Sequence, residues 1–181
     1  MKWTPPIKPS GFTLLELLVT IAVAAILMAI ALPAFDRLVR DMRTESAAWS
    51  IFNATQAARS YAVKSNMRVT MLANPTWRRG WQIFYDENHN GLYDEQERLI
   101  QTQGELHESI EVKGNRPVED YISYLGTGES RWASGEREGA FQAGTLTVCP
   151  ADEGPGFALV LSRGGRLRTE KLNNEECSTS T

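Results

Sequence analysis

A single carboxylate lies inside the most apolar stretch of the chain. Phe12 to Leu32 is a run of 21 residues in which Glu16 is the only charged side chain. A charged group at mid-bilayer depth costs about 2.5–3.5 kcal/mol, so a carboxylate in such a run indicates a functional site. The chemistry open to Glu16 is charge pairing, because near the positive end of a helix dipole it can neutralise an amine.

A second group of oxygen-bearing side chains follows the pattern D-x-[DN]-x-[DN]-G-x5-E between residues 86 and 97. This pattern is typical of a calcium loop, in which side-chain oxygens and one backbone carbonyl bind Ca²⁺. The flanking segments have the composition of strands, however, and the same residues suit a plain turn with a left-handed glycine, which we favour. The candidate ligands are Asp86, Asn88, Asn90, the carbonyl of Leu92, Asp94 and Glu97.

Near the C-terminus, Gly164 and Gly165 separate two extended runs and predict a β-hairpin. A two-residue loop would place Arg166 on the same face as Leu161 and would bury it. A three-residue loop instead pairs Leu161 with Leu167, so that the leucines face inward together and the arginines point outward. Because burial of an unpaired arginine is costly, we predict the three-residue loop with a glycine in the left-handed conformation.

The hairpin loop and its second strand carry four cations and one anion, Glu170, which gives residues 163–171 a net charge of +3. Arginines two positions apart on a strand are separated by about 6.6 Å, close to the spacing of successive phosphates along one nucleic-acid strand. The ribbon therefore indicates a surface that could bind DNA phosphates. Its cations are Arg163, Arg166, Arg168 and Lys171.

The apolar run is long enough to hold Glu16 within a membrane. At about 1.5 Å per residue, 21 helical residues span roughly 31 Å, which matches the hydrocarbon core. Lys2 and Lys8 precede the run, so the N-terminus is expected in the cytoplasm and the rest of the chain outside the inner membrane. A cleaved secretory signal fits less well, because Asp36 and Arg37 continue the helical pattern beyond the run. The periodicity alone does not exclude an ordinary membrane anchor.

This membrane topology sets the compartment, and therefore the expected oxidation state, of the two cysteines. Cys149 and Cys177 would lie in an oxidising compartment, so we expect them to form a disulfide. In the chain-entropy model such a bridge stabilises the fold by about 3–4 kcal/mol. A redox or metal role is disfavoured, since the sequence has no CxxC spacing and His89 and His107 lie far from both cysteines.

The remaining pattern predicts an α+β protein, with one long helix packed on an antiparallel β-sheet head. Ala48, Ile51, Thr55, Ala58 and Ala62 form one helical stripe that should face the sheet. Short apolar runs after Asn66 predict eight strands, and residues 126–139 predict a long surface loop. The predicted strands are 68–73, 81–85, 98–102, 110–113, 121–125, 145–149, 157–161 and 166–170.

The N-terminal junction, Gly11-Phe-Thr-Leu-Leu-Glu16, resembles the prepilin junction of type IV pilins and type II secretion pseudopilins. In that superfamily a prepilin peptidase cuts after the glycine and methylates the new N-terminus, here Gly11 and Phe12. The glutamate pairs with the N-terminal amine of a neighbouring subunit, here Glu16. Pro33 also stands where pilins often carry a helix-kinking proline. The resemblance implies four segments: a leader (1–11), a transmembrane assembly helix (12–32), its continuation (33–64) and a β-rich head (65–181).

The head is similar to the GspH/FimT branch of this superfamily. The similarity rests on the loop at 86–97, on Leu146-Thr-Val-Cys149-Pro150 and on Leu159 to Arg168 followed by Cys177. In FimT-type members a C-terminal Gly-Arg-x-Arg is implicated in binding DNA for natural transformation. That resemblance implies that Gly165, Arg166 and Arg168 contact DNA, with Arg163 and Lys171 beside them. The alternative is an H-type minor pseudopilin of a type II secretion system, which binds proteins only.

Composition limits the other function classes. The net charge of −3 excludes a globally basic nucleic-acid binder, so any DNA binding must come from a local patch. No nucleophile–base pair or carboxylate pair indicates an enzyme, and no cofactor is expected apart from the calcium alternative. The expected partners are other pilins, the prepilin peptidase, the inner membrane and DNA. The chain is expected as a single-pass inner-membrane protein with a periplasmic head, and in a pilus after assembly.

Overall fold

The computed structural model describes residues 12–179, in which one long helix, α1 (Leu14–Ser65), is followed by a β-rich head. The predicted leader, with Gly11, lies outside the described residues. The helix begins after Thr13, whose Oγ1 accepts the backbone N–H of Glu16 at 3.2 Å, the bond of an N-cap residue. α1 continues through Pro33 to Ser65, which confirms the predicted helix to within two residues.

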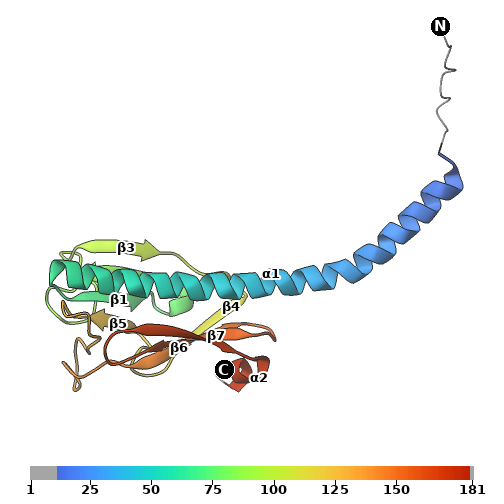
Figure 1. The fold of residues 1–181 in the computed structure, drawn as a ribbon. Helices are drawn as coiled ribbons and strands as arrows, with labels where there is room; N and C mark the ends of the chain where they lie inside the picture. Colours follow the sequence, from blue (N-terminus) through green and yellow to red (C-terminus); the bar gives the residue numbers. More distant parts are fainter. Residues whose placement is uncertain (1–11, 180–181) are drawn as a thin grey trace, which may run out of the picture. The chain divides into compact units, whose positions relative to one another are not determined.

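The chain divides into two compact units, one ending at Val39 and the other running from Arg40 to Thr181. In the second unit the predicted stripe of α1 is buried, including Ile51, Ala58 and Ala62 with no exposed surface. Thr55 is also buried. Its hydroxyl donates to the carbonyl of Ile51 at 2.8 Å, so the buried polar group has a hydrogen-bond partner. Small side chains let this half of the helix lie close against the head, as Figure 1 shows along β1.

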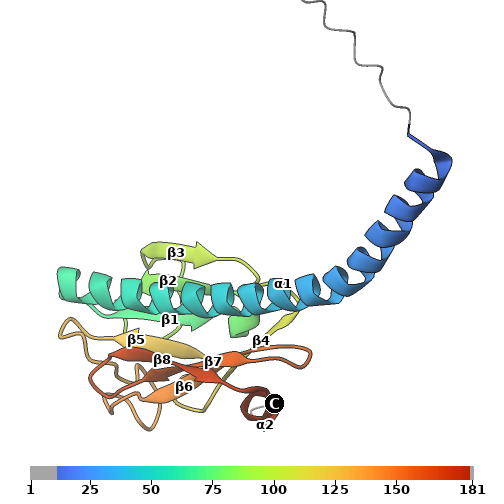
Figure 2. The ribbon, with the colours of Figure 1, turned by 45° about the vertical axis from the view of Figure 1, so that its right-hand side comes forward.

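All eight predicted strands are present, with ends that shift by at most two residues. They divide between two antiparallel sheets instead of forming one. The first sheet has the order β3-β2-β1-β5 and the second β4-β6-β7-β8 (Figure 2). Their bounds are β1 (Val69–Ala73), β2 (Trp81–Tyr85), β3 (Leu99–Gln103), β4 (Ile110–Gly114), β5 (Tyr121–Tyr124), β6 (Gly144–Pro150), β7 (Gly156–Leu161) and β8 (Leu167–Leu172).

One apolar core joins α1 to both sheets. It includes Ile51 of α1, Met71 and Ile83 of the first sheet, and Leu146 and Leu159 of the second. Two short helices were not predicted: η1 (Trp77–Arg79), which buries Trp77, and α2 (Asn174–Thr179) at the C-terminus. The core therefore fixes the edge strand β8, and the hairpin that precedes it, relative to α1.

The segment predicted as a surface loop after Gly126 is held at several points. Isolated bridges pair Tyr124 with Ser130 and Arg131 with Phe141. The guanidinium of Arg131 lies 3.7 Å from the centre of the Phe141 ring and forms an ion pair with Glu129 at 3.0 Å. This segment is thus an ordered loop next to the C-terminal hairpin.

Candidate functional site

The arginine hairpin, residues 161–168, has the predicted register. Leu161 pairs with Leu167, and the N–H of Ser162 donates to the carbonyl of Arg166 at 2.9 Å. Within the loop, the N–H of Gly165 donates to the carbonyl of Ser162 at 2.9 Å, and Gly165 has a φ of +74°. The three-residue loop with a left-handed glycine is confirmed, and both leucines are buried beneath it.

The hairpin does not present all the predicted DNA-contacting residues in the same way. Arg163, Arg166 and Arg168 are exposed, but Arg168 forms an ion pair with Glu170, two positions along the same face of β8. Lys171 is also exposed, yet its odd position on the strand places it on the opposite face from Arg166 and Arg168. Two of the four cations, Arg163 and Arg166, lie close to the hairpin loop and form no ion pair among the described residues, and we call them the cationic tip. DNA contact by the four cations stays a prediction.

Gly165 shapes the tip and does not offer it a contact surface. The residue is buried, and a Cβ added to it would lie 2.1 Å from the carbonyl oxygen of Gly128. Only glycine allows both this close approach and the positive φ. Gly165 therefore has a structural role, because it lets the loop dock on the 125–129 turn. Contact of Gly165 with DNA stays a prediction.

One residue that the sequence did not single out connects this docked loop to α1. Arg59 donates from Nε to the carbonyl of Gly128 at 2.8 Å and from Nη2 to the carbonyl of Gly164 at 3.3 Å. Its position directly after the buried Ala58 indicated a residue at the edge of the buried stripe. Nothing local indicated that its partners would come from residues about 70 and 105 positions further along the chain.

Beneath the hairpin, the hydroxyl of Tyr124 is buried without a hydrogen-bond partner. Burial raises its pKa well above the ordinary value of 10.0, and the nearby positive charge of Arg59 opposes that rise only in part. A buried polar group without a partner is costly, so this hydroxyl detracts from stability.

We expect Tyr124→Phe to raise the free energy of unfolding of the head by about 1 kcal/mol, since the cost of the unpaired hydroxyl disappears. The effect should also depend on pH. In the wild type, the unfolded chain ionises this phenol above its ordinary pKa of 10.0 while the folded chain does not, so stability decreases above that pH. Urea unfolding at neutral and alkaline pH measures both effects. A variant less stable than the wild type would contradict the prediction.

The loop at residues 86–97 brings only some of its predicted calcium ligands together. The side-chain amides of Asn88 and Asn90 donate to Asp94 Oδ2 at 2.6 and 3.0 Å. The carboxylate of Glu97 instead accepts the backbone N–H groups of Glu87 and Asp94, at 2.9 and 3.2 Å. In these contacts, N–H groups of the loop itself bond to the carboxylate oxygens that a cation would need as ligands.

Asp86 is held by other contacts. It is fully buried, and its Oδ2 accepts the hydroxyl of Thr70 at 2.8 Å and the N–H of Gly91 at 3.2 Å. With Arg68 it lines a different hollow from the one lined by Asn88, Asp94 and Glu97. Among residues 12–179, no group of three or more His, Cys, Asp or Glu side chains is arranged to hold a metal ion. Gly91 has a φ of +76°, the left-handed conformation that the predicted turn requires. The choice of the plain turn over a calcium loop stays a prediction.

We accordingly expect millimolar Ca²⁺ to leave the melting temperature of the protein unchanged relative to a chelator. A site filled at a hundred times its dissociation constant would add about 2.7 kcal/mol of stability. That gain would raise the melting temperature by several degrees, with Mg²⁺ as the matched control. A rise specific to Ca²⁺ would show that the loop rearranges around the ion.

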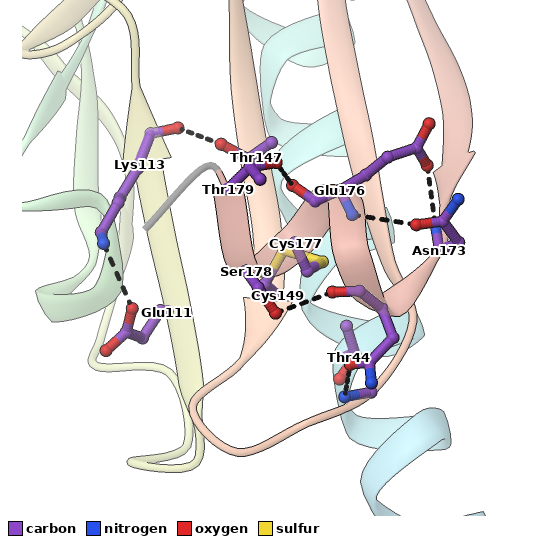
Figure 3. The surroundings of a disulfide bond; sticks show 12 residues. Thr44, Glu111, Lys113, Thr147, Cys149, Asn173, Glu176, Cys177, Ser178 and Thr179 are labelled. Carbon is purple, nitrogen blue, oxygen red and sulfur yellow. Dashed lines mark hydrogen bonds and ion pairs between the residues drawn. A yellow bond between two sulfur atoms is a disulfide. The ribbon is translucent and has the colours of Figure 1, made fainter.

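The predicted disulfide between Cys149 and Cys177 is present, with the two Cα atoms 5.8 Å apart. It ties α2, which holds Cys177, to β6, which holds Cys149 (Figure 3). Asn173 caps α2: the N–H of Glu176 donates to its Oδ1 at 2.9 Å, and its own N–H donates to Glu176 Oε2 at 2.8 Å. The end of β8 is thereby held at a second place, far from the hairpin loop.

At the other end of the chain, α1 is the one described helix long and apolar enough to cross a membrane. Its apolar window is exposed throughout, and Phe12 and Glu16 are exposed as well. Glu16 lies in the first turn of α1, where a carboxylate interacts favourably with the helix dipole. Its pairing with a neighbouring subunit's amine stays a prediction.

Two family models match parts of the chain. The family model of the type II transport protein GspH matches residues 47–165, and that of the prokaryotic N-terminal methylation motif matches residues 8–32. No curated protein sequence matches the chain significantly.

Solved structures show a similar fold. The type IV minor pilin FimU of Pseudomonas aeruginosa is 19% identical, with a TM-score of 0.56 over 74% of this chain and 92% of that one. The minor pseudopilin EpsH from the type II secretion system of Vibrio cholerae is 16% identical, with a TM-score of 0.50 over 75% of this chain and 96% of that one. At these identities the likeness shows the shared fold.

Proposed function

Because this chain belongs to the family of the type II transport protein GspH, we propose that it is a minor pilin of a type IV pilus whose arginine hairpin binds DNA. The coarser assignment, a minor pilin or pseudopilin of a type IV pilus or type II secretion system, follows from the family, the methylation motif and the fold. Its role is structural, as a subunit that associates with other pilins.

During assembly, α1 would lie first in the inner membrane and then in the filament. In the inner membrane it anchors the subunit, with the head on the periplasmic side. After the prepilin peptidase cuts behind Gly11 and methylates Phe12, the helix moves into the filament, where Glu16 meets a neighbour's amine. Mass spectrometry of the native protein tests this step: we expect a mature chain that begins at a methylated Phe12. Retention of residues 1–11 would contradict it.

DNA binding rests on the position of Arg163 and Arg166 at the solvent-exposed tip of a locked hairpin. Their guanidinium groups can contact phosphates, which carry no sequence information, so binding should be independent of sequence. Two or three such contacts support only weak association per subunit. We expect a dissociation constant in the micromolar range or above, which several subunits in a filament would strengthen through avidity.

Fluorescence anisotropy of a labelled random-sequence duplex with the Arg40–Thr181 head tests this proposal. We expect log K to fall by about 0.9 per phosphate contact for each tenfold rise in salt. Two to three contacts therefore predict a slope between about −1.8 and −2.7. Failure to bind DNA at low salt would contradict the proposal.

The second candidate is an H-type minor pseudopilin of a type II secretion system, which the family description and the likeness to EpsH favour. Such a subunit would have the same anchor and a similar head, and it would bind only proteins. A purified head that does not bind DNA, together with co-purification of the full chain with a secretion pseudopilus, would support this candidate.

A further inference from the structure

The arginine hairpin is held by a contact from outside its own sheet. Arg59 is half-buried on α1 and reaches across to the hairpin loop, where Nη2 donates to the carbonyl of Gly164 at 3.3 Å. Its Nε donates at 2.8 Å to the carbonyl of Gly128, in the turn on which the loop rests. A single guanidinium thus joins three segments that are distant in sequence.

The space around this contact is closely filled. A Cβ on Gly128 would lie 3.1 Å from Cγ2 of Val63 and 3.2 Å from Nε of Arg59. A Cβ on Gly165 would lie 2.1 Å from the carbonyl oxygen of Gly128. The loop and the turn therefore approach each other at backbone distance, and the turn packs against the side chains of Val63 and Arg59 on α1. Arg59 supplies the polar link between the three segments.

The link acts on the residues of the cationic tip. Gly164 lies directly after Arg163 and two residues before Arg166, so fixing its carbonyl limits the directions in which both arginines leave the backbone. β8 is an edge strand. Its loop is restrained by pairing with β7, by the close approach of Gly165 to Gly128, and by the bond from Arg59 to Gly164, which is the one of these three that comes from α1. A binding site that is formed only part of the time has an affinity reduced by that fraction.

We propose that Arg59 is a positioning residue for DNA binding, which holds the hairpin loop so that Arg163 and Arg166 face phosphates together. This inference rests on the proposed function and extends it to a residue on α1. Both acceptors of Arg59 are uncharged carbonyls, so its positive charge adds to the potential around the tip. Its role is nevertheless to orient the tip and not to touch the phosphates.

Four proteins test this inference, each used as the full chain in a non-ionic detergent: wild type, Arg59→Gln, Arg59→Lys and Lys64→Gln. Lys64 is an exposed cation in the last turn of the same helix, so it controls for the loss of one charge. The readouts are affinity for a random-sequence duplex, the salt dependence of binding, and hydrogen exchange of the hairpin amides without DNA.

We expect Arg59→Gln to weaken binding by about tenfold, as for a site formed a tenth of the time. The exchange of the Gly165 amide should accelerate, while the amides shared by β6 and β7 stay protected. Arg59→Lys should also bind more weakly than wild type, because an ammonium does not reproduce the two-pronged contact. Lys64→Gln should stay within about twofold of wild type, as expected for a screened charge outside the site.

The slope of log K against log salt separates positioning from contact. It should be the same in Arg59→Gln as in wild type, because the number of phosphate contacts does not change. A slope smaller by about 0.9 would make Arg59 a phosphate contact and overturn the inference. The inference would also be overturned if Arg59→Gln bound DNA as tightly as Lys64→Gln, or if hydrogen exchange of the Gly165 amide were unchanged in Arg59→Gln. A wild-type protein that does not bind DNA would instead overturn the proposed function itself.

Discussion

Replacing Arg163 and Arg166 together by glutamine is expected to reduce DNA binding of the head below detection while its melting temperature changes by less than about 2 °C. Both side chains are exposed, and surface substitutions of this kind alter stability by about 0.5 kcal/mol or less. Binding depends on them because only a local patch of this acidic protein can attract phosphates. Anisotropy at low salt and thermal unfolding measure the two quantities on the same samples.

The structure provides two matched controls for this double variant. Arg168→Gln with Glu170→Gln removes an ion pair from the same strand without changing the net charge, and should leave DNA affinity nearly unaltered. Lys171→Gln removes one cation from the opposite face of β8 and should weaken binding less than Arg166→Gln does. If Lys171→Gln had the larger effect, the DNA would lie on the other face of the hairpin.

The register of the hairpin could be predicted because it follows from local rules. Period-two alternation allowed one loop length that placed Leu161 and Leu167 on the same side without burying arginine, and that register is present. The same alternation also places Glu170 on the face of Arg168, and Lys171 on the other face. The face of β8 on which each charged residue lies could therefore be predicted from the sequence alone.

The helix caps have spacings that are visible in the sequence, although the second helix was not predicted from it. Thr13 stands three residues before Glu16, and Asn173 stands three residues before Glu176, which is the spacing of a capping box. In α2 both reciprocal bonds are present. The short helix was missed because its six residues carry no periodic apolar face, which is the usual signal for a helix.

The remaining features depend on contacts that no local pattern contains. Division of the strands into two sheets follows from pairing over long separations, for example β1 with β5 and β4 with β6. The partners of Arg59 are likewise set by the fold. For Asp86, the calcium pattern gave the residue type but not its burial or the bond that its Oδ2 accepts from the hydroxyl of Thr70.

Glutamine in place of Glu16 is expected to reduce incorporation into filaments at least about tenfold while the leader is still removed. In the proposed maturation, cleavage after Gly11 leaves a charged amine at Phe12. An uncompensated charge in the apolar interior costs about 2.5–3.5 kcal/mol, equivalent to more than a tenfold change in an equilibrium. The substitution keeps the shape of the side chain and removes only its charge. The N-cap bond at the start of α1 uses the backbone N–H of residue 16, so the helix should begin at the same place.

Immunoblots of sheared filaments against membrane fractions measure incorporation, and mass spectrometry of the membrane fraction reports whether the chain begins at Phe12. Glu16→Asp is the matched control, because it retains a carboxylate in the first turn of α1 and should assemble better than the glutamine variant. Normal assembly of Glu16→Gln would mean that the carboxylate of Glu16 lies near the membrane surface without a role in assembly. The apolar helix would then act as a simple anchor, and the neighbour's amine would need another partner.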